Sequence, residues 1–200
     1  MTSLIHDSKA GYLLAGGRSS RMGSDKAFLE FRGETLIDRS LRVLRSVCED
    51  VTIVGDPATF HNYSQVVQDR VTGCGPLGGI YTALSTSDAE LNVILAVDMP
   101  FVSEELLRYL LDFAGKNKAE VTIPQTTAGW QPLCAIYRPA FAPLAKKAIE
   151  RGDYKIDHAF SESTICAVRE DDLIRAGFSE HNFINLNTPE DRAAAENLRP

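Results

Sequence analysis

Short apolar runs alternate with amphipathic segments along this chain, and the alternation constrains its fold more than any other feature. The runs predict strands at residues 11–14, 51–54, 65–67, 92–97 and 120–123. Strands that alternate with helices form a parallel sheet covered on both faces. We therefore expect an α/β fold with a mostly parallel central sheet and helices on both faces, in one domain that spans residues 1–200.

Residue types at their ends mark three of the expected helices. The clearest runs from Thr35 to about Val47, with its apolar residues on one face. A second begins after Ser103, whose hydroxyl can cap the first free N–H groups. The last has Thr188 as N-cap and Pro189 at the first helical position, where a missing N–H costs nothing.

Charge and composition exclude several classes of protein. The formal net charge is −6 and the 21 Lys and Arg residues are scattered, so the broad basic surface of a nucleic-acid-binding protein is not expected. The chain has no basic start followed by a long apolar stretch and no run of about 18 apolar residues. We expect a cytoplasmic protein that does not bind a membrane. The cysteines are widely spaced and are expected to be reduced thiols: Cys48, Cys74, Cys134 and Cys166.

A glycine-rich loop with the sequence LAGGRSSRMGSDK follows the first expected strand, from Leu14 to Lys26. Glycines such as Gly16 and Gly17 let successive N–H groups converge on an anion, and Arg21 and Lys26 add positive charge. The spacing matches neither the P-loop of NTPases nor the dinucleotide fingerprint. We interpret the loop as a triphosphate-binding segment; the alternative is a surface loop with solvated cations.

Asp98 follows the apolar run NVILAV, at the point where an open parallel sheet presents its ligands. A carboxylate there can hold Mg²⁺, which prefers hard oxygen ligands. The alternative role is a cap for the next helix, but Ser103 lies closer to that helix. The histidines show no metal-ligand spacing and no serine lies in a nucleophile-elbow pattern, so hydrolase mechanisms gain no support.

The segment LAGGRSSRMGSDKAFLEFRGETLIDR resembles the signature of the molybdenum cofactor guanylyltransferases, the MobA family. Four later blocks are similar to family blocks in the family's order: GPLGGIYTAL, VDMPFVS, WQPLCAIYR and INLNTPED. The resemblance spans most of the chain. It implies a Rossmann-like nucleotidyltransferase fold and a Mg²⁺-dependent transfer of GMP from GTP to the terminal phosphate of molybdopterin or Mo-molybdopterin, with release of pyrophosphate. Other molybdenum cofactor biosynthesis or acceptor proteins are possible partners.

The resemblance also implies roles for single residues. The backbones of Leu14, Ala15 and Gly16 are expected to contact the nucleotide, and Lys26 to contact phosphate or base. Asp69 is expected in the base-binding region and Asp98 at the metal. Related enzymes can carry a base-contacting Asn just after the second strand, whereas this chain has Val54 and Gly55 there. Arg21, Lys26 and Asp98 are the expected catalytic residues.

The last two blocks contain residues with two interpretations each. Asn185 and Asn187 can reach metal, phosphate or pterin, or can simply form the turn that leads into the Thr188 cap. Trp130, Gln131 and Tyr137 form either a flat surface for a pterin or ordinary core packing.

Two alternatives to guanylyl transfer remain at this point. A cytidylyltransferase, or a sugar or polyol phosphate nucleotidyltransferase, would use the same loop. A catalytically silent nucleotide-binding protein would keep the loop without needing the metal carboxylate, so Asp98 argues against it.

Overall fold

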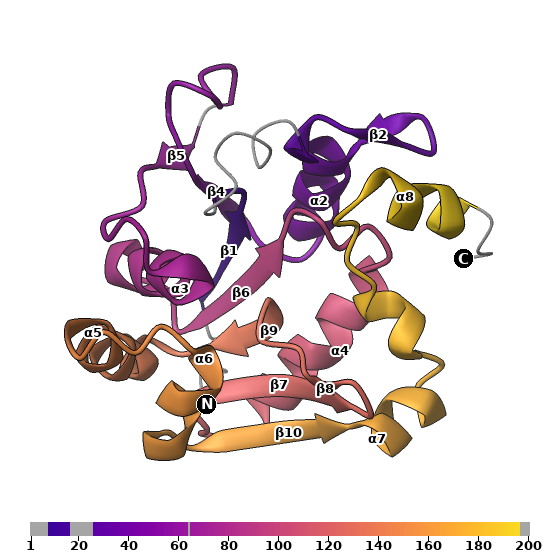
Figure 1. Cartoon of the computed structure of the whole chain (residues 1–200). Coiled ribbons are helices and arrows are strands. Elements are labelled where there is room, and N and C mark those ends of the chain that lie inside the picture. The colour runs from indigo at the N-terminus through magenta and orange to yellow at the C-terminus, as the bar shows by residue number, and fades with distance from the viewer. Residues whose placement is uncertain (1–7, 17–25, 64, 197–200) are drawn as a thin grey trace, which may run out of the picture.

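The computed structural model describes residues 8–16, 26–63 and 65–196, and its centre is one twisted sheet (Figure 1). The strands follow the order β10-β7-β9-β6-β1-β4-β5, with β8 paired to β7. All five strands expected from the sequence are present. The bounds are Lys9–Leu14 (β1), Asp50–Val54 (β4), Val66–Val67 (β5), Leu91–Ala96 (β6), Val121–Thr126 (β7), Gly129–Trp130 (β8), Cys134–Tyr137 (β9) and Ile165–Arg169 (β10).

The sheet is mostly parallel, as predicted, but one antiparallel strand lies inside it. β1 pairs in parallel with both β4 and β6, and β10 pairs in parallel with β7. β9 lies between β6 and β7 and runs antiparallel to both. All four of its residues are buried, which explains its continuous apolar sequence Cys-Ala-Ile-Tyr. The sequence did not predict β9 or β10.

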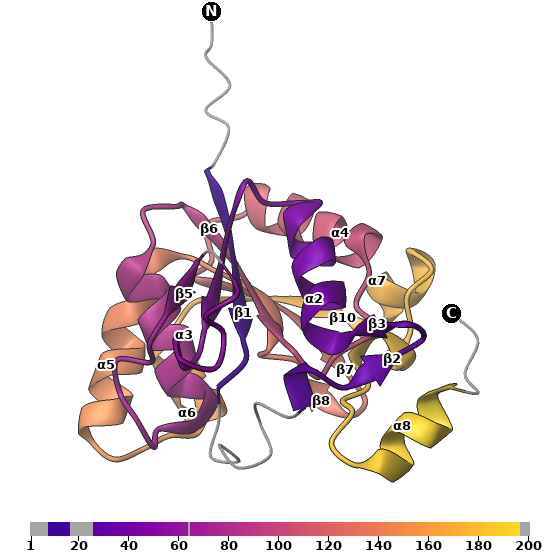
Figure 2. The same cartoon turned by 90° about the horizontal axis from the view of Figure 1, so that it is seen from above.

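Helices cover the two faces of the sheet in separate layers, as predicted (Figure 2). One layer contains α2 (Leu36–Arg45), α4 (Glu104–Gly115) and α7 (Glu170–Arg175). The other contains α3 (Gly75–Thr86), α5 (Ala142–Glu150) and α6 (Ile156–Ala159). Three short 3₁₀ helices connect these elements at Pro139–Phe141, Phe160–Glu162 and Glu180–Phe183. The final helix, α8 (Pro189–Glu196), lies near the hairpin formed by β2 (Glu30–Phe31) and β3 (Glu34–Thr35) (Figure 1).

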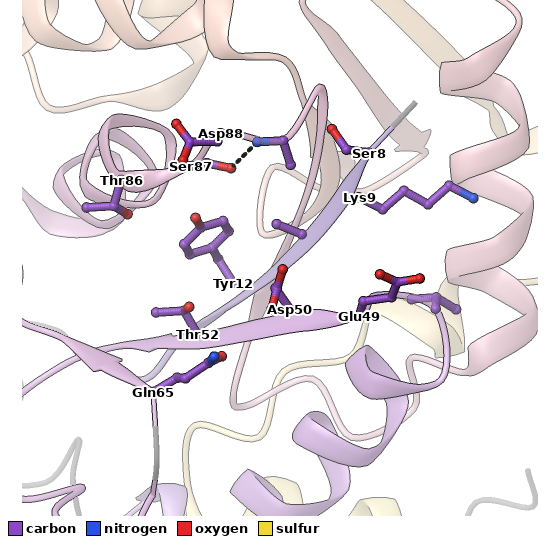
Figure 3. A pocket seen from close by; sticks show the side chains of 13 residues that line it. Ser8, Lys9, Tyr12, Glu49, Asp50, Thr52, Gln65, Thr86, Ser87 and Asp88 are labelled. Atoms are coloured by element: carbon purple, nitrogen blue, oxygen red, sulfur yellow. Dashed lines mark hydrogen bonds between the residues drawn. The ribbon is translucent and has the colours of Figure 1, made fainter. Parts of the chain in front are cut away.

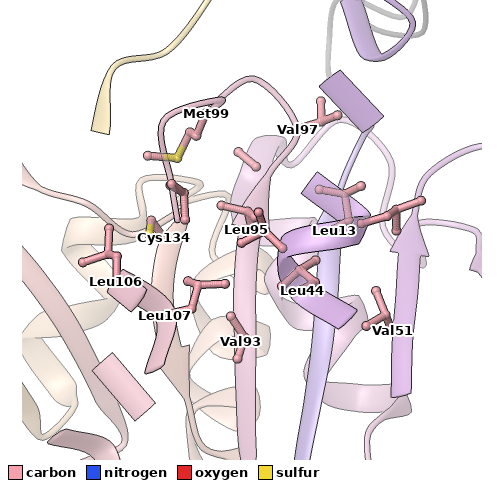
Figure 4. Close-up of a cluster of buried hydrophobic side chains, with 14 of the residues drawn as sticks. Leu13, Leu44, Val51, Val93, Leu95, Val97, Met99, Leu106, Leu107 and Cys134 are labelled. Atoms are coloured by element: carbon pink, nitrogen blue, oxygen red, sulfur yellow. The ribbon is translucent and has the colours of Figure 1, made fainter. Parts of the chain in front are cut away.

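The core between the sheet and the α2–α4 layer is made of aliphatic side chains from successive parallel strands. Leu13 of β1 and Leu95 of β6 pack against Leu44 of α2 and Leu107 of α4, and none of the four is more than 1% exposed (Figure 4). Each fully buried leucine contributes about 1.5–3 kcal/mol by leaving water. This packing holds the strand ends, and the loops that follow them, in fixed relative positions.

Caps are present at all three predicted helix starts, and those at Ser103 and Thr188 confirm the predicted caps. Thr35 accepts a hydrogen bond from the Asp38 amide at 3.2 Å, and Ser103 accepts one from the Leu106 amide at 3.3 Å. Thr188 accepts one from the Asp191 amide at 3.0 Å, and α8 begins at the next residue, as predicted. The Asp191 carboxylate in turn accepts from the Thr188 amide at 2.8 Å, so the cap is reciprocal.

The four cysteines are free thiols, as expected. Burial raises the pKa of both Cys48 and Cys134 to about 12, so these two thiols stay protonated and unreactive near neutral pH. Among the described residues, no helix is long and apolar enough to cross a membrane.

Candidate active site

Parallel strands β1, β4 and β6 end side by side at one edge of the sheet, and several of the predicted site residues that the structure describes lie there. Gly16 follows β1, Gly55 follows β4 and Asp98 follows β6. Ligands of open α/β sheets bind outside the carboxyl ends of the strands. Two groups of residues form at this edge: the lining of a cavity over β1 and β4, and a polar cluster beside β6.

The cavity has a volume of about 420 Å³, which suits a small ligand. It contains the predicted nucleotide-contacting residues Leu14 and Gly16 and the predicted base-region residue Asp69. Ala15 lies between these two lining residues, Leu14 and Gly16. The Ala15 amide donates to the Val54 carbonyl at 3.1 Å. The full lining is Leu14, Gly16, Val54, Gly55, Asp56, Gln68, Asp69, Thr72, Gly73, Gly75, Pro76 and Gly79.

Asp69 is held in a defined orientation by α3. The buried Thr82 hydroxyl donates to Asp69 Oδ1 at 2.8 Å, and the Val71 amide donates to the same oxygen at 3.4 Å. Both bonds fall on Oδ1, which leaves Oδ2 to accept from a ligand. A carboxylate that is already oriented loses little entropy when it binds.

Gly55 is one of the two residues, with Val54, at the strand end where the resemblance led us to look for an asparagine. A Cβ built on Gly55 would lie 2.7 Å from Cε2 of the buried Phe60 ring, closer than real contacts allow. The Phe60 ring therefore fills the space that a side chain at residue 55 would need. A residue larger than glycine at this strand end would require the Phe60 ring to move.

Gly78 lets α3 approach the Asp69 loop closely. A Cβ on Gly78 would lie 2.9 Å from the Val71 carbonyl oxygen and 3.2 Å from the Cys74 Cβ. Glycine at this position brings the start of α3, with Gly75 and Pro76, to the wall of the cavity.

We expect Gly78→Ala to lower the free energy of unfolding by about 1–3 kcal/mol, because a backbone carbonyl cannot move aside as a side-chain end can. The matched control is Gly115→Ala at the end of α4, where a Cβ would meet nothing within 4 Å. That variant should be neutral or gain up to about 1 kcal/mol from helix propensity. Urea unfolding of both variants measures the difference, and equal stabilities would contradict the close approach.

Lys26, Asp98 and Asn187 come together beside the end of β6. Lys26 Nζ donates to Asn187 Oδ1 at 3.2 Å, across 161 positions of sequence. The Leu186 amide donates to the Asp98 carbonyl at 2.8 Å and fixes the C-terminal segment next to Asp98. Asn187 therefore contacts a predicted catalytic residue through its side chain, and its amide takes part in the turn before α8 by donating to Asp191 Oδ2 at 2.9 Å.

The environment of Asp98 is that of a carboxylate suited to a cation. Burial raises the pKa of Asp98, and the Lys26 ammonium opposes this shift. Among the described residues, no group of three His, Cys, Asp or Glu side chains could hold a metal ion. A single carboxylate fits Mg²⁺, which keeps several waters and completes its shell with substrate phosphates. The donor set therefore suits a metal that arrives with a nucleotide, and does not suit a structural zinc site.

The remaining predicted residues have varied positions. Asn185 is exposed, two residues before Asn187. Tyr137 is fully buried, packs on Phe141 and donates its hydroxyl to the Pro132 carbonyl, so the pterin interpretation was wrong for Tyr137 and core packing is correct. Trp130 is half-buried with its ring edge-on to Phe160, and Gln131 donates to Thr126. The glycine-rich loop residues Gly17 and Arg21 lie outside the described residues.

Several cavity residues had no predicted role. Gln68, Thr72 and Gly73 come from the loop between β5 and α3, and Gly75, Pro76 and Gly79 come from α3 itself. The block GPLGGIYTAL was the available signal, because it joined the resemblance without a function attached to it. Its density of glycines indicates a helix start that approaches other backbone closely.

A mostly parallel sheet that brings a lysine, a carboxylate and a small-ligand cavity together at the carboxyl ends of its strands is typical of a nucleotide-binding enzyme. Residues 11–165 match the family model described as MobA-like NTP transferase domain. The chain belongs to this family of nucleotidyltransferases.

Relatives and solved structures agree with the family assignment. The chain is 34% identical to a "Probable molybdenum cofactor guanylyltransferase" of Pelotomaculum thermopropionicum. The matching segment covers 94% of this chain and 94% of that protein. It is 30% identical to a protein of the same name from Natranaerobius thermophilus, over 92% of this chain and 93% of that one. The crystal structure of molybdopterin-guanine dinucleotide biosynthesis protein A from Archaeoglobus fulgidus superposes with a TM-score of 0.81 at 27% identity, covering 94% of this chain and 96% of the other.

Proposed function

We propose that this protein is a molybdenum cofactor guanylyltransferase. It transfers GMP from GTP to the terminal phosphate of molybdopterin and so forms molybdopterin guanine dinucleotide. The names of its relatives support the substrates, and the observation that carries the chemistry is the Lys26–Asn187 contact beside the half-buried Asp98. That cluster adjoins the same sheet edge as the cavity over β1 and β4.

In the proposed complex, guanine occupies the cavity next to Leu14 and Asp69. Guanine presents an N1–H and a 2-amino group on one edge, and Asp69 Oδ2 is an acceptor for such donors. The start of α3 lines the same cavity with Gly75 and Pro76, and the positive end of a helix suits the guanine carbonyl or a phosphate oxygen. The triphosphate then extends from Gly16 toward Lys26.

Mg²⁺ is the proposed metal, held by Asp98. Bound there, it would polarise the α-phosphate and offset the charge of the leaving pyrophosphate. Asp98 supplies one hard oxygen ligand, and the triphosphate and water supply the others. Burial raises the pKa of Asp98, and the Lys26 ammonium favours the charged carboxylate by opposing that shift.

The acceptor is proposed to bind on the C-terminal side of the cluster. Asn185 and Asn187 are in this segment, and the turn that carries Gln131 adjoins β6, because the Ala96 amide donates to the Leu133 carbonyl at 2.9 Å. Trp130 presents a half-buried ring near this turn. An aromatic ring and two amides match a flat heterocycle that carries hydrogen-bonding groups.

The reaction requires positioning and charge neutralisation more than proton transfer. An oxygen of the acceptor phosphate attacks the α-phosphorus of GTP, a new P–O bond forms, and the bond to the β-phosphate bridging oxygen breaks. Pyrophosphate leaves with that oxygen. The attacking phosphate is already an anion, so no protein nucleophile is needed. Lys26 lowers the repulsion between the two anions.

One assay tests the proposal as a whole. Purified protein is supplied with molybdopterin, Mg²⁺ and each NTP in turn, and both pyrophosphate and the dinucleotide are measured. The proposal expects pyrophosphate only when GTP and molybdopterin are both present. Dinucleotide formed from CTP would instead identify a cytidylyltransferase, and nucleotide binding without turnover would identify the silent binding protein.

We expect Lys26→Met to reduce guanylyl transfer by about a hundredfold, because the methionine keeps the aliphatic length but removes the charge that faces the phosphates. Stability should change by less than about 1 kcal/mol, since the lost Asn187 contact is a surface hydrogen bond. Steady-state kinetics and thermal unfolding separate the two effects. A variant that unfolds instead would show that Lys26 is structural. Lys116→Met, on the exposed end of α4, is the matched control.

A further inference from the structure

The two ends of the central parallel strands differ in how their polar side chains are held. At the amino ends of β1 and β4, Lys9, Glu49 and Asp50 are exposed around an open hollow of about 670 Å³ (Figure 3). At the carboxyl end of β6, Asp98 is half-buried and begins the loop 98–101. Segments that are far from this loop in the sequence fix its backbone.

Each of the four backbone carbonyls of the loop 98–101 accepts a hydrogen bond. The amides of Leu186 and Val102 donate to the first two carbonyls, at 2.8 and 3.3 Å. The side chains of Arg39 and Asn182 donate to the last two, at 2.6 and 3.1 Å. Loops are usually the more mobile parts of a fold, so a loop with every carbonyl bound is held unusually firmly.

Arg39 reaches the loop from α2. Its Nε donates to the Pro100 carbonyl, and its guanidinium lies 3.9 Å from Glu34 and 6.0 Å from the centre of the Phe31 ring. The Phe101 ring of the loop packs edge-on against the same Phe31 ring, with 5.5 Å between centroids. Only 24% of the Arg39 side chain is exposed, and a charged donor to a carbonyl makes a stronger bond than a neutral one.

Asn182 reaches the loop from the C-terminal segment. Its Nδ2 donates to the Phe101 carbonyl, while its Oδ1 accepts from the Ser179 amide at 2.9 Å. Both contacts require the same orientation of the amide group, which fixes the donor toward the loop. The same segment continues to Leu186, whose amide donates to the Asp98 carbonyl.

We propose that Arg39 and Asn182 are positioning residues for the transfer reaction, which hold the loop 98–101 so that the Asp98 carboxylate stays where Mg²⁺ enters with GTP. The inference rests on the proposed guanylyltransferase function, in which Asp98 is the protein ligand of the metal. A displacement of this one carboxylate therefore weakens the site directly. Contacts that orient a metal ligand from outside are commonly as important as the ligand itself.

Two substitutions of equal length separate the Pro100 contact from the charge of Arg39. The side-chain nitrogen of glutamine is bonded to Cδ, as Nε of arginine is, so Arg39→Gln keeps a donor at that place. Arg39→Met keeps the length without a donor, and both variants remove the charge. At saturating Mg²⁺ we expect Arg39→Met to lower kcat by about tenfold and to change KM for GTP by less than about twofold. Arg39→Gln should keep at least about half of kcat.

Two measurements without turnover compare the same variants. Electron paramagnetic resonance gives the Mn²⁺ affinity in the presence of an α,β-methylene analogue of GTP, which cannot donate GMP. Arg39→Met should weaken Mn²⁺ binding by about fivefold and Arg39→Gln by less than about twofold. In the protein without nucleotide, the Leu186 amide should exchange with solvent about tenfold faster in Arg39→Met than in Arg39→Gln.

A second variant and a control complete the test. Asn182→Asp keeps the acceptor for the Ser179 amide but loses the donor to the Phe101 carbonyl, so its kcat and Mn²⁺ affinity should fall as those of Arg39→Met do. This variant also decides the question if Arg39→Met does not fold. Arg45→Met removes a charge from an exposed position of α2 and should change both quantities by less than about twofold.

Equal kcat and equal Mn²⁺ affinity of Arg39→Met and Arg39→Gln overturn the positioning role. Equal losses would show that the charge of Arg39 matters, and two unaffected variants would show that the loop does not need the contact. Absence of dinucleotide from the unaltered protein would instead refute the guanylyltransferase function. The Mn²⁺ and exchange measurements would then still decide whether Arg39 and Asn182 position Asp98.

Discussion

Asp98→Asn should remove guanylyl transfer almost completely, by at least about a hundredfold in kcat, while the protein stays folded. The amide oxygen of asparagine is a weaker Mg²⁺ ligand than a carboxylate. The side chain keeps its shape, so the Leu186 contact to the Asp98 backbone carbonyl should survive. Turnover measured at limiting and at saturating Mg²⁺ gives the effect on the metal.

The stability of the same variant is equally informative. Burial raises the pKa of Asp98, so the charged carboxylate contributes no stability to the fold at neutral pH, and an uncharged amide should leave the melting temperature unchanged or raise it. Asp112→Asn, on the exposed face of α4, serves as the control and should keep full activity. Unchanged turnover of Asp98→Asn at limiting Mg²⁺ would refute the metal assignment.

The second large effect is expected in base selection. The protein should bind GTP more tightly than ATP, CTP or UTP, because only guanine offers two adjacent donors to Asp69. Asp69→Ala should weaken GTP binding by about a hundredfold, the loss of one or two charge-assisted hydrogen bonds, and should hardly change CTP binding. Titration of the four nucleotides in the presence of Mg²⁺ measures both effects.

Thr82→Val tests whether the orientation of Asp69 matters. The variant keeps the carboxylate but removes the hydroxyl that donates to Asp69 Oδ1 at 2.8 Å, so we expect a smaller loss of GTP affinity, about fivefold. Tighter binding of CTP than of GTP by the unaltered protein would identify it as a cytidylyltransferase. If Asp69→Ala and the unaltered protein bind GTP with equal affinity, Asp69 does not contact the base. The transferase assignment would still hold.

Local sequence signals predicted most of the fold. The five predicted strands depend on apolar periodicity, and the predicted caps at Ser103 and Thr188 depend on hydrogen bonds within a few residues. A single segment expresses both signals by itself. β9 was not predicted, because four apolar residues after a proline-containing turn are equally compatible with packed coil. Its antiparallel direction depends on β6 and β7, which lie on either side of it.

In the candidate site, too, the sequence indicated single residues and the tertiary structure brought them together. Family blocks pointed to Lys26, Asp98 and Asn187 separately, and the spacing of these residues along the chain contained no information that they meet. The close approach arises because β1 and β6 are adjacent parallel strands and the Leu186 amide bonds to the Asp98 carbonyl. Tyr137 illustrates the opposite outcome, since an aromatic residue in a family block proved to belong to the core.

The sequence by itself determined the alternation of strands and helices, the glycines and cations of the first loop and the carboxylate that follows the NVILAV run, because these depend on residue type and local spacing. Tertiary structure alone decided that Phe60 fills the space beside Gly55 and that Thr82 orients Asp69. These properties depend on distances between segments that are far apart in the chain, and only close packing of the whole molecule sets such distances.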